Sequence, residues 1–191
     1  MDAPAPLRLY QYRPLKSYTT IRVLVLQPAK DLYGLLKAQL VHVQGEHLLL
    51  GHGSPDYYEV VPYCWGEPKL SHVLLVNEDS TLGITSNADT LLRHLRSSSK
   101  PRYLWIDAIC LNKEDRNEKQ IQVQLMGRIY AQAAKARIWV GTATEHQHVP
   151  QLYNALKWLA TLLKNKETPA PAEAEIFLET TCANSLLGPN F

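Results

Sequence analysis

One stretch in the middle of the chain, residues 104–130, constrains the fold more than any other. It reads LWIDAICLNKEDRNEKQIQVQLMGRIY. An apolar run ends in a polar patch, and apolar residues then recur every fourth position, at Ile121, Leu125 and Ile129, as on one face of a helix. A β-rich run follows at residues 136–141. This order predicts a βαβ unit, whose two strands run parallel and are joined by a right-handed crossover.

The other segments are consistent with an α/β domain built around that unit. Their composition and turn residues predict strands at 21–28 and 57–66, a strand or short helix at 35–43, a hairpin at 72–85 that turns at Asn77–Asp79, a helix capped by Thr85 or Ser86, and a helix at 151–166. The order of elements predicts a parallel sheet core with an added antiparallel hairpin.

Composition excludes several classes of function. The formal net charge is +2, which is too small to indicate binding to nucleic acid. The apolar runs are far shorter than the roughly 20 residues that a membrane span needs, and the N-terminus lacks a secretion signal. The three cysteines Cys64, Cys110 and Cys182 form no CxxC pair. We therefore expect reduced thiols in a cytoplasmic protein, with neither a disulfide framework nor a metal site.

Asp107 is the residue that strand formation does not explain. A strand over residues 103–111 would place Asp107 on the same face as Trp105 and Ile109. A buried carboxylate must be paired, hydrogen-bonded or protonated. Ligands of open α/β sheets bind at the carboxyl ends of parallel strands, where Asn112 falls. Asp107 is therefore either a structural hydrogen-bond acceptor or part of a site.

The polar patch after this run also has two interpretations. Asp115 is a natural N-cap for the next helix, and Glu118, three residues later, would complete a capping box. Glu118 could instead supply the acid of a site, together with Asp107. Gln122 fits a solvated or packing amide better than a ligand contact. Both interpretations of the acids stay open at this point.

A second cluster, PYCWGEP at residues 62–68, places two aromatic residues beside a glycine at the end of a strand. Tyr63 and Trp65 could stack on a planar ring of a ligand, with Gly66 allowing close approach, or they could belong to the core. Pro62 favours an edge position or a bulge. No histidine is spaced to activate the Cys64 thiol as a nucleophile.

These two blocks resemble the signature blocks of the fungal heterokaryon incompatibility (HET) domain. The first is YEVVPYCWGEP, and the second is LWIDAICLNKEDRNEKQIQVQLMGRIYAQAAKARIWVG. Pro62 stands where serine is usual, Lys113 where glutamine is usual and Lys119 where arginine is usual. The resemblance implies an N-terminal extension at 1–15, a HET domain at 16–165, and a linker-like, incomplete C-terminal segment at 166–191.

The resemblance implies a role in fungal non-self recognition, as a signalling or assembly module that triggers heterokaryon incompatibility or programmed cell death. The expected partners are a second copy or another incompatibility or NLR-type protein, with no nucleic acid and no membrane span. The family is also distantly similar to Toll/interleukin receptor-like (TIR) domains. That likeness implies a flavodoxin-like, mostly parallel sheet flanked by helices.

The likeness to TIR domains implies an alternative function as an NAD glycohydrolase, with NAD as substrate and no fixed cofactor or metal. Candidate catalytic acids would then be Glu118 and Asp107, and candidate ligand-binding residues would be Tyr63, Trp65, Gly66, Asn112 and Gln122. HET domains typically continue into a segment resembling Arg-x-Trp-x-x-Gln-Glu, which this sequence lacks. We therefore expect a truncated, naturally short or non-catalytic form, inactive if that glutamate is required.

Overall fold

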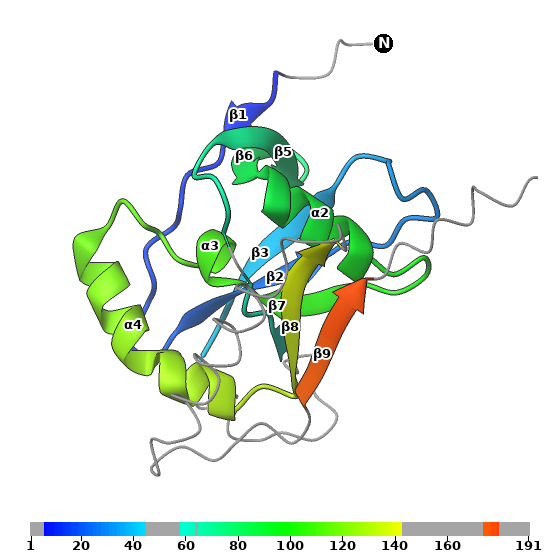
Figure 1. Ribbon diagram of the computed structural model, residues 1–191. Helices are drawn as coiled ribbons and strands as arrows, with labels where there is room; N and C mark the ends of the chain where they lie inside the picture. Colours follow the sequence, from blue (N-terminus) through cyan, green and yellow to red (C-terminus); the bar gives the residue numbers. More distant parts are fainter. Residues whose placement is uncertain (1–5, 45–57, 64, 143–173, 180–191) are drawn as a thin grey trace, which may run out of the picture.

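The computed structural model describes residues 6–44, 58–63, 65–142 and 174–179, which build a single nine-stranded sheet with helices packed beside it (Figure 1). The strand order is β1-β6-β5-β3-β2-β7-β4-β8-β9. The strands are β1 (Arg8–Leu9), β2 (Ile21–Leu26), β3 (Lys37–Val43), β4 (Glu59–Val60), β5 (Leu70–Val76), β6 (Ser80–Thr85), β7 (Arg102–Trp105), β8 (Lys135–Thr142) and β9 (Ala174–Glu179). The helices are α2 (Ser86–Leu95), α3 (Asp107–Cys110) and α4 (Arg116–Ala131).

The sheet is mixed, which confirms the α/β class and corrects the expectation of a parallel core. The strands β7, β4, β8 and β9 run parallel to one another. The central strand β2 is antiparallel to both of its neighbours, β3 and β7. The predicted strand–helix–strand unit is present as β7, α4 and β8. Its two strands are parallel, as expected, but β4 lies between them.

The predicted hairpin and its following helix are confirmed. β5 pairs antiparallel with β6, and the turn between them places Asn77 and Glu78 at φ values of 53° and 69°. Positive φ at both central residues is typical of the tight turns that match strand twist. Thr85 caps α2, its side chain accepting a hydrogen bond from the Ala88 backbone N–H at 3.2 Å. The segment 35–43, left open between strand and helix, contains β3.

The strand predicted over residues 103–111 is wrong in its second half. β7 ends at Trp105, and the chain turns into the one-turn helix α3. The Asp107 carboxylate accepts a hydrogen bond from the Ala108 N–H at 2.7 Å, and the Cys110 N–H donates to the Ile106 carbonyl at 2.7 Å. A short acidic side chain that bonds the local backbone competes with strand pairing in this way. Asp107 therefore lies at the start of a helical turn beyond the strand.

The predicted apolar stripe of α4 is only partly buried. Ile129 is buried, but Ile121 is 39% exposed. The N-terminal half of the helix instead buries two polar side chains, Glu118 and Gln122. These side chains face polar groups at the start of β2, so polar pairing holds this end of α4 to the sheet. In Figure 1, α4 lies at the side of the molecule, away from α2.

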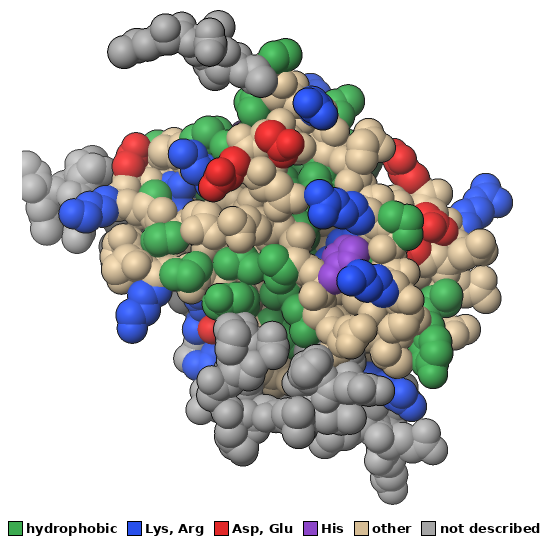
Figure 2. Space-filling view, turned by 180° about the vertical axis from the view of Figure 1, so that it is seen from behind, with side chains coloured by type: hydrophobic (Ala, Val, Ile, Leu, Met, Phe, Trp, Pro, Cys, Tyr) green, Lys and Arg blue, Asp and Glu red, His purple; other side chains and the backbone are tan. Residues whose placement is uncertain are grey.

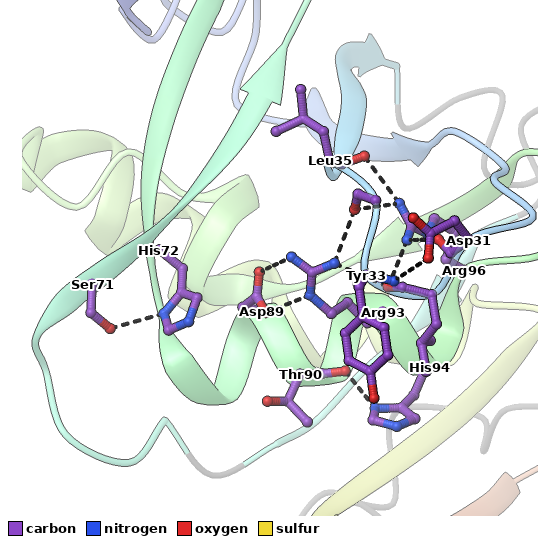
Figure 3. Close-up of polar contacts among 12 residues, drawn as sticks. Asp31, Tyr33, Leu35, Ser71, His72, Asp89, Thr90, Arg93, His94 and Arg96 are labelled. Carbon is purple, nitrogen blue, oxygen red and sulfur yellow. Dashed lines mark hydrogen bonds and ion pairs between the residues drawn. The ribbon is translucent and has the colours of Figure 1, made fainter.

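Two arginines of α2 and its C-cap fix the loop between β2 and β3 (Figure 3). The Arg93 guanidinium donates to the Leu32 and Gly34 carbonyls and forms an ion pair with Asp89. Arg96 donates to four backbone carbonyls of the same loop, those of Asp31, Leu32, Gly34 and Leu35. The core lies beneath this contact, because the leucines of α2 pack against the sheet. The loop is thus part of the folded body.

One face of the sheet carries exposed apolar side chains. Strand register places Leu9, Leu70, Val73 and Leu75 on the same face, opposite the buried side chains that contact α2. Leu9, Leu70 and Val73 are 75%, 67% and 51% exposed. Figure 2 shows hydrophobic side chains gathered on the side of the molecule turned away from the view of Figure 1. We call these four residues the apolar sheet face.

The remaining predictions meet the structure only in part. The strand expected at 57–66 is reduced to β4, followed by an isolated bridge between Tyr63 and Trp139. The helix expected at 151–166 lies outside the described residues. In the part of the chain that the structure describes, no helix is long and apolar enough to cross a membrane.

Candidate functional site

Trp65 and Asp107 are joined by a direct hydrogen bond. The indole Nε1–H of Trp65 donates to Oδ1 of Asp107 at 3.2 Å. Trp65 follows β4 and is 45% exposed, whereas Asp107 follows the neighbouring parallel strand β7 and is half-buried. The bond therefore forms where two adjacent parallel strands end. This is the edge of the sheet at which the sequence predicted a site.

Gly66 sets the path of the loop that presents Trp65. Its φ is +68°, a left-handed conformation that a residue with a side chain rarely adopts. A Cβ at this position would lie 2.5 Å from the Asn87 side-chain nitrogen, on the first turn of α2. The glycine thus allows close packing of the loop on α2, which holds the indole over the start of α3.

Lys113 covers the Trp65 ring from the loop after α3. Its Nζ lies 3.6 Å from the ring centroid, within the range of a cation–π contact. Partial burial lowers the pKa of Lys113, while Asp107 acts in the opposite direction and favours the charged form. The Lys113 ammonium is thus attracted both by the face of the Trp65 indole and by the Asp107 carboxylate.

The Asp107 carboxyl has a perturbed acidity. Burial raises its pKa, and this effect outweighs the Ala108 N–H, Lys113 and the Trp65 N–H, all of which lower it. A carboxyl whose pKa is shifted by burial together with a specific charged partner is a candidate functional residue. Asp107 thus combines access, partners and perturbed acidity.

Tyr63 completes this cluster from the buried side. Burial is the main cause that raises the pKa of its hydroxyl, and Asp107 adds to the shift, whereas the Thr85 side chain lowers it. Within the part of the chain that the structure describes, its Oη is buried and forms no hydrogen bond of normal geometry. We refer to Tyr63, Trp65, Asp107 and Lys113 as the indole site.

Glu118 lies in a different environment, bound to Arg22. The carboxylate accepts hydrogen bonds from two guanidinium nitrogens of Arg22, from Nη1 at 2.5 Å and from Nη2 at 2.8 Å. It also accepts a hydrogen bond from the Asn112 backbone N–H at 2.8 Å. The side chain of Arg22 is fully buried. Arg22 further donates to the carbonyls of Cys110 and Arg13. These contacts tie β2, the end of α3 and the start of α4 together.

The capping box predicted for α4 is therefore only half present. Asp115 is the N-cap, accepting the backbone N–H groups of Asn117 and Glu118 at 3.0 Å each. The Glu118 side chain does not complete the box, because the arginine from β2 and the Asn112 N–H take its carboxylate oxygens. A bidentate ion pair with a buried guanidinium outweighs a single hydrogen bond from a backbone N–H.

Gln122 and Asn112 form structural contacts next to this pair. The Gln122 side-chain amide is 1% exposed and donates to the Thr20 carbonyl at 3.0 Å. The Asn112 side chain accepts the Glu114 N–H at 3.2 Å and so turns the loop that carries Lys113. We refer to Arg22, Glu118, Asn112 and Gln122 as the arginine clamp.

The structure thus divides the predicted site residues into two groups. Trp65 and Asp107 meet in the indole site, with Tyr63 and Gly66 on the same loop as Trp65. Glu118, Asn112 and Gln122 belong to the clamp. Arg22 was missed, although an arginine inside the apolar run IRVLVL is itself a signal, since a buried charge needs a partner.

The cysteine that the structure describes is a buried thiol of low acidity. Cys110 is buried, and burial raises the pKa of its thiol to about 12. Among the described residues, no group of three His, Cys, Asp or Glu side chains could hold a metal ion.

A known protein family matches the part of the chain that contains residues of both groups. The family model described as "Heterokaryon incompatibility protein (HET)" matches residues 58–184. The chain is similar to "Heterokaryon incompatibility protein 6, OR allele" of Neurospora crassa, with 34% identity over 143 residues. That match covers 66% of this chain and 19% of the relative, so the chain spans about a fifth of the relative's length. No solved structure matches the chain.

The family match includes the residues after β4 that carry Trp65, the turn at Asp107 and the whole of α4. It extends over more than half of the sequence, and the two blocks that resemble the family's signatures provide the indole site and most of the clamp. The chain belongs to the heterokaryon incompatibility (HET) family.

Proposed function

We propose that this domain acts in fungal heterokaryon incompatibility as a signalling and assembly module, which converts non-self recognition into growth arrest or programmed cell death. The observation that carries the proposal is membership of the HET family, together with similarity to a protein named for incompatibility. The proposed location of this response is the cytoplasm.

The apolar sheet face supports the assembly part of the proposal. Leu9, Leu70 and Val73 expose much of their side chains on one side of β1 and β5. Contiguous exposed apolar surface commonly marks a protein interaction site. The proposed partner is a second copy or another incompatibility or NLR-type protein, with the sheet face as the surface that it covers.

Expression of the chain in a compatible fungal strain tests this proposal. Wild type is expected to arrest growth or kill cells, and Val73→Lys is expected to abolish this response, because it places a charge on the apolar sheet face. Ser98→Lys adds the same charge at an exposed position outside that face and is the matched control. No response from the folded wild-type chain, or equal responses from both variants, would contradict the proposal.

A second function, NAD glycohydrolase activity, is favoured by one observation: Asp107 combines a raised pKa with direct contact to an exposed indole. In this reaction water adds to the anomeric carbon of the ribose, the bond to nicotinamide breaks, and a proton is released. A nearby carboxylate would stabilise the oxocarbenium-like transition state, and Trp65 would flank the ring that leaves. The flavodoxin-like, TIR-related architecture belongs to this second proposal.

Nicotinamide release by the purified chain tests the second function. Asp107→Asn is expected to abolish release without unfolding the domain, because an amide can still accept the Trp65 and Ala108 N–H groups. Glu118→Gln is expected to reduce it only through loss of order in the clamp. Release that survives Asp107→Asn, or no release from a well-folded wild type, would reject this function for the chain.

A further inference from the structure

Lys113 occupies a position that suits a positively charged ligand. Its Nζ lies 3.6 Å from the centre of the indole ring of Trp65, a residue that is 45% exposed. The same indole donates its N–H to the Asp107 carboxylate at 3.2 Å. An aromatic face beside a carboxylate is the combination that recognises organic cations, because the ring quadrupole and the negative charge both attract them.

The lysine is not the cation that fits this position best. Burial lowers the pKa of Lys113, and Lys119 on α4 lowers it further by repulsion. An ammonium group is compact and strongly hydrated, so it loses much hydration when it lies against a ring. A cation whose charge is spread over methyl groups or an aromatic ring is more weakly hydrated and would lose less.

The lysine is also held there by the chain itself. Lys113 follows Asn112, whose backbone N–H is bound by Glu118. The Asn112 side chain turns the next residues by accepting the Glu114 N–H. The ammonium therefore lies near the ring at a high effective concentration and competes with any free cation.

We propose that Trp65 and Asp107 form a binding site for a weakly hydrated organic cation, a quaternary ammonium or a pyridinium-type ring, and that Lys113 occupies this site when no ligand is bound. In this site the Trp65 ring contacts the cation through its face, and the Asp107 carboxylate is the counter-ion. Ligand binding displaces the ammonium into solvent. Removal of the lysine charge therefore opens the site and leaves both recognition elements in place.

Binding measurements on the full chain with two defined cations test this inference. Choline is the quaternary ammonium probe, the N-methylnicotinamidium cation is the pyridinium probe, and neutral nicotinamide is the uncharged control. Lys113→Gln is expected to tighten cation binding about tenfold in calorimetric titrations, since a competing state no longer occupies the site. Binding should shift the Trp65 indole N–H resonance. The probe with the larger gain identifies which cation type the site takes.

Matched variants separate this site from general electrostatics. Lys119→Gln removes the same charge from a neighbouring exposed position without touching the ring, so it is expected to change affinity less than twofold, on the order of a screened surface charge. Asp107→Asn and Trp65→Ala, each made in the Lys113→Gln background, are expected to lose the gain. Thermal unfolding checks that each variant is folded.

Two results would overturn the inference. One is cation affinity in Lys113→Gln no higher than in wild type. The other is an equal gain for neutral nicotinamide, which would show that a cleared apolar surface binds without regard to charge. The inference rests on the proposed indole site but not on turnover. Cation binding without nicotinamide release would support it and reject the NAD glycohydrolase, whereas the incompatibility response is measured separately in cells.

Discussion

The two acids Asp107 and Glu118 belong to the same segment of chain but have opposite environments. Glu118 is buried, and both of its oxygens are engaged by Arg22 and the Asn112 N–H. Asp107 is half-buried; it accepts hydrogen bonds from an exposed indole and from the neighbouring Ala108 N–H, and the Lys113 charge lies near it. From the sequence, either acid could be structural or functional. The difference shows that the arrangement of partners, more than residue type, separates a clamp from a site.

The comparison also explains why one segment contains both acids. The clamp fixes the ends of the short stretch from α3 to α4, since Arg22 binds the Cys110 carbonyl and Glu118 binds the Asn112 N–H. Lys113 then extends from a fixed backbone toward Trp65. The clamp therefore acts as the support on which the indole site is built. Disruption of the clamp should affect both regions, whereas changes in the site should leave the clamp intact.

Loss of the clamp arginine is expected to have the largest effect. Arg22→Met leaves the buried Glu118 carboxylate without its counter-charge, and breaking a buried pair in this way typically costs about 3–5 kcal/mol of unfolding free energy. Urea unfolding followed by circular dichroism measures the change. The Trp65 indole N–H resonance should also shift, because the loop that carries Lys113 loses its support.

A double variant provides the control for this prediction. Arg22→Met combined with Glu118→Met removes both charges and is expected to recover most of the lost stability, because no uncompensated charge remains. If the double variant is no more stable than Arg22→Met alone, the loss comes from packing, and the clamp is not primarily electrostatic.

The amide of the clamp should have the next largest effect. Gln122→Ala removes the buried donor to the Thr20 carbonyl and leaves that acceptor without this partner, at a cost of about 1–3 kcal/mol. Gln120→Ala, on the exposed side of the same helix, is the matched control. The two unfolding curves should be clearly separated. Coincident curves would mean that the Thr20 contact contributes nothing to the attachment of α4.

Among changes in the indole site and the Trp65 loop, substitution of Gly66 is expected to lower the free energy of unfolding most. Gly66→Ala forces a side chain into a conformation at φ +68°, which costs roughly 1–2 kcal/mol. The new Cβ would also displace the Asn87 amide. The expected result is a modest loss of stability together with a change in the Trp65 indole resonance. A change in stability with an unaltered Trp65 signal would show that the loop does not position the indole.

Much of the fold followed from local signals in the sequence. The hairpin, the Thr85 cap, the Asp115 cap and the strand IRVLVL are set by residues close to one another, and each is confirmed. The position of β4 between β7 and β8 could not be predicted, because it depends on pairing between residues distant in the chain. The same is true of the two antiparallel partners of β2.

The contacts among the candidate site residues could be predicted only in part. Trp65 and Asp107 were candidates from two separate blocks of sequence, and the structure joins them by a hydrogen bond. The partner of Glu118 is 96 positions earlier in the chain, beyond the reach of any helix-capping pattern. The turn at Asp107 was missed because an apolar run around an acid has the same pattern in a strand and in a short buried helical turn.

The smallest expected effect is the dependence of stability on pH through Asp107. Burial raises the pKa of its carboxyl above the ordinary value of 3.8, so the folded chain binds this proton more tightly than the unfolded chain does. The resulting stabilisation is fully present below pH 3.8 and is lost as the pH rises through the folded-state pKa. The free energy of unfolding of wild type minus that of Asp107→Asn should therefore fall as the pH rises through that window. Urea unfolding at closely spaced pH values measures this difference. A difference that grows with pH would contradict the prediction. It would mean that the Trp65, Ala108 and Lys113 contacts outweigh burial, and that Asp107, like Glu118, is held as a charged structural acid.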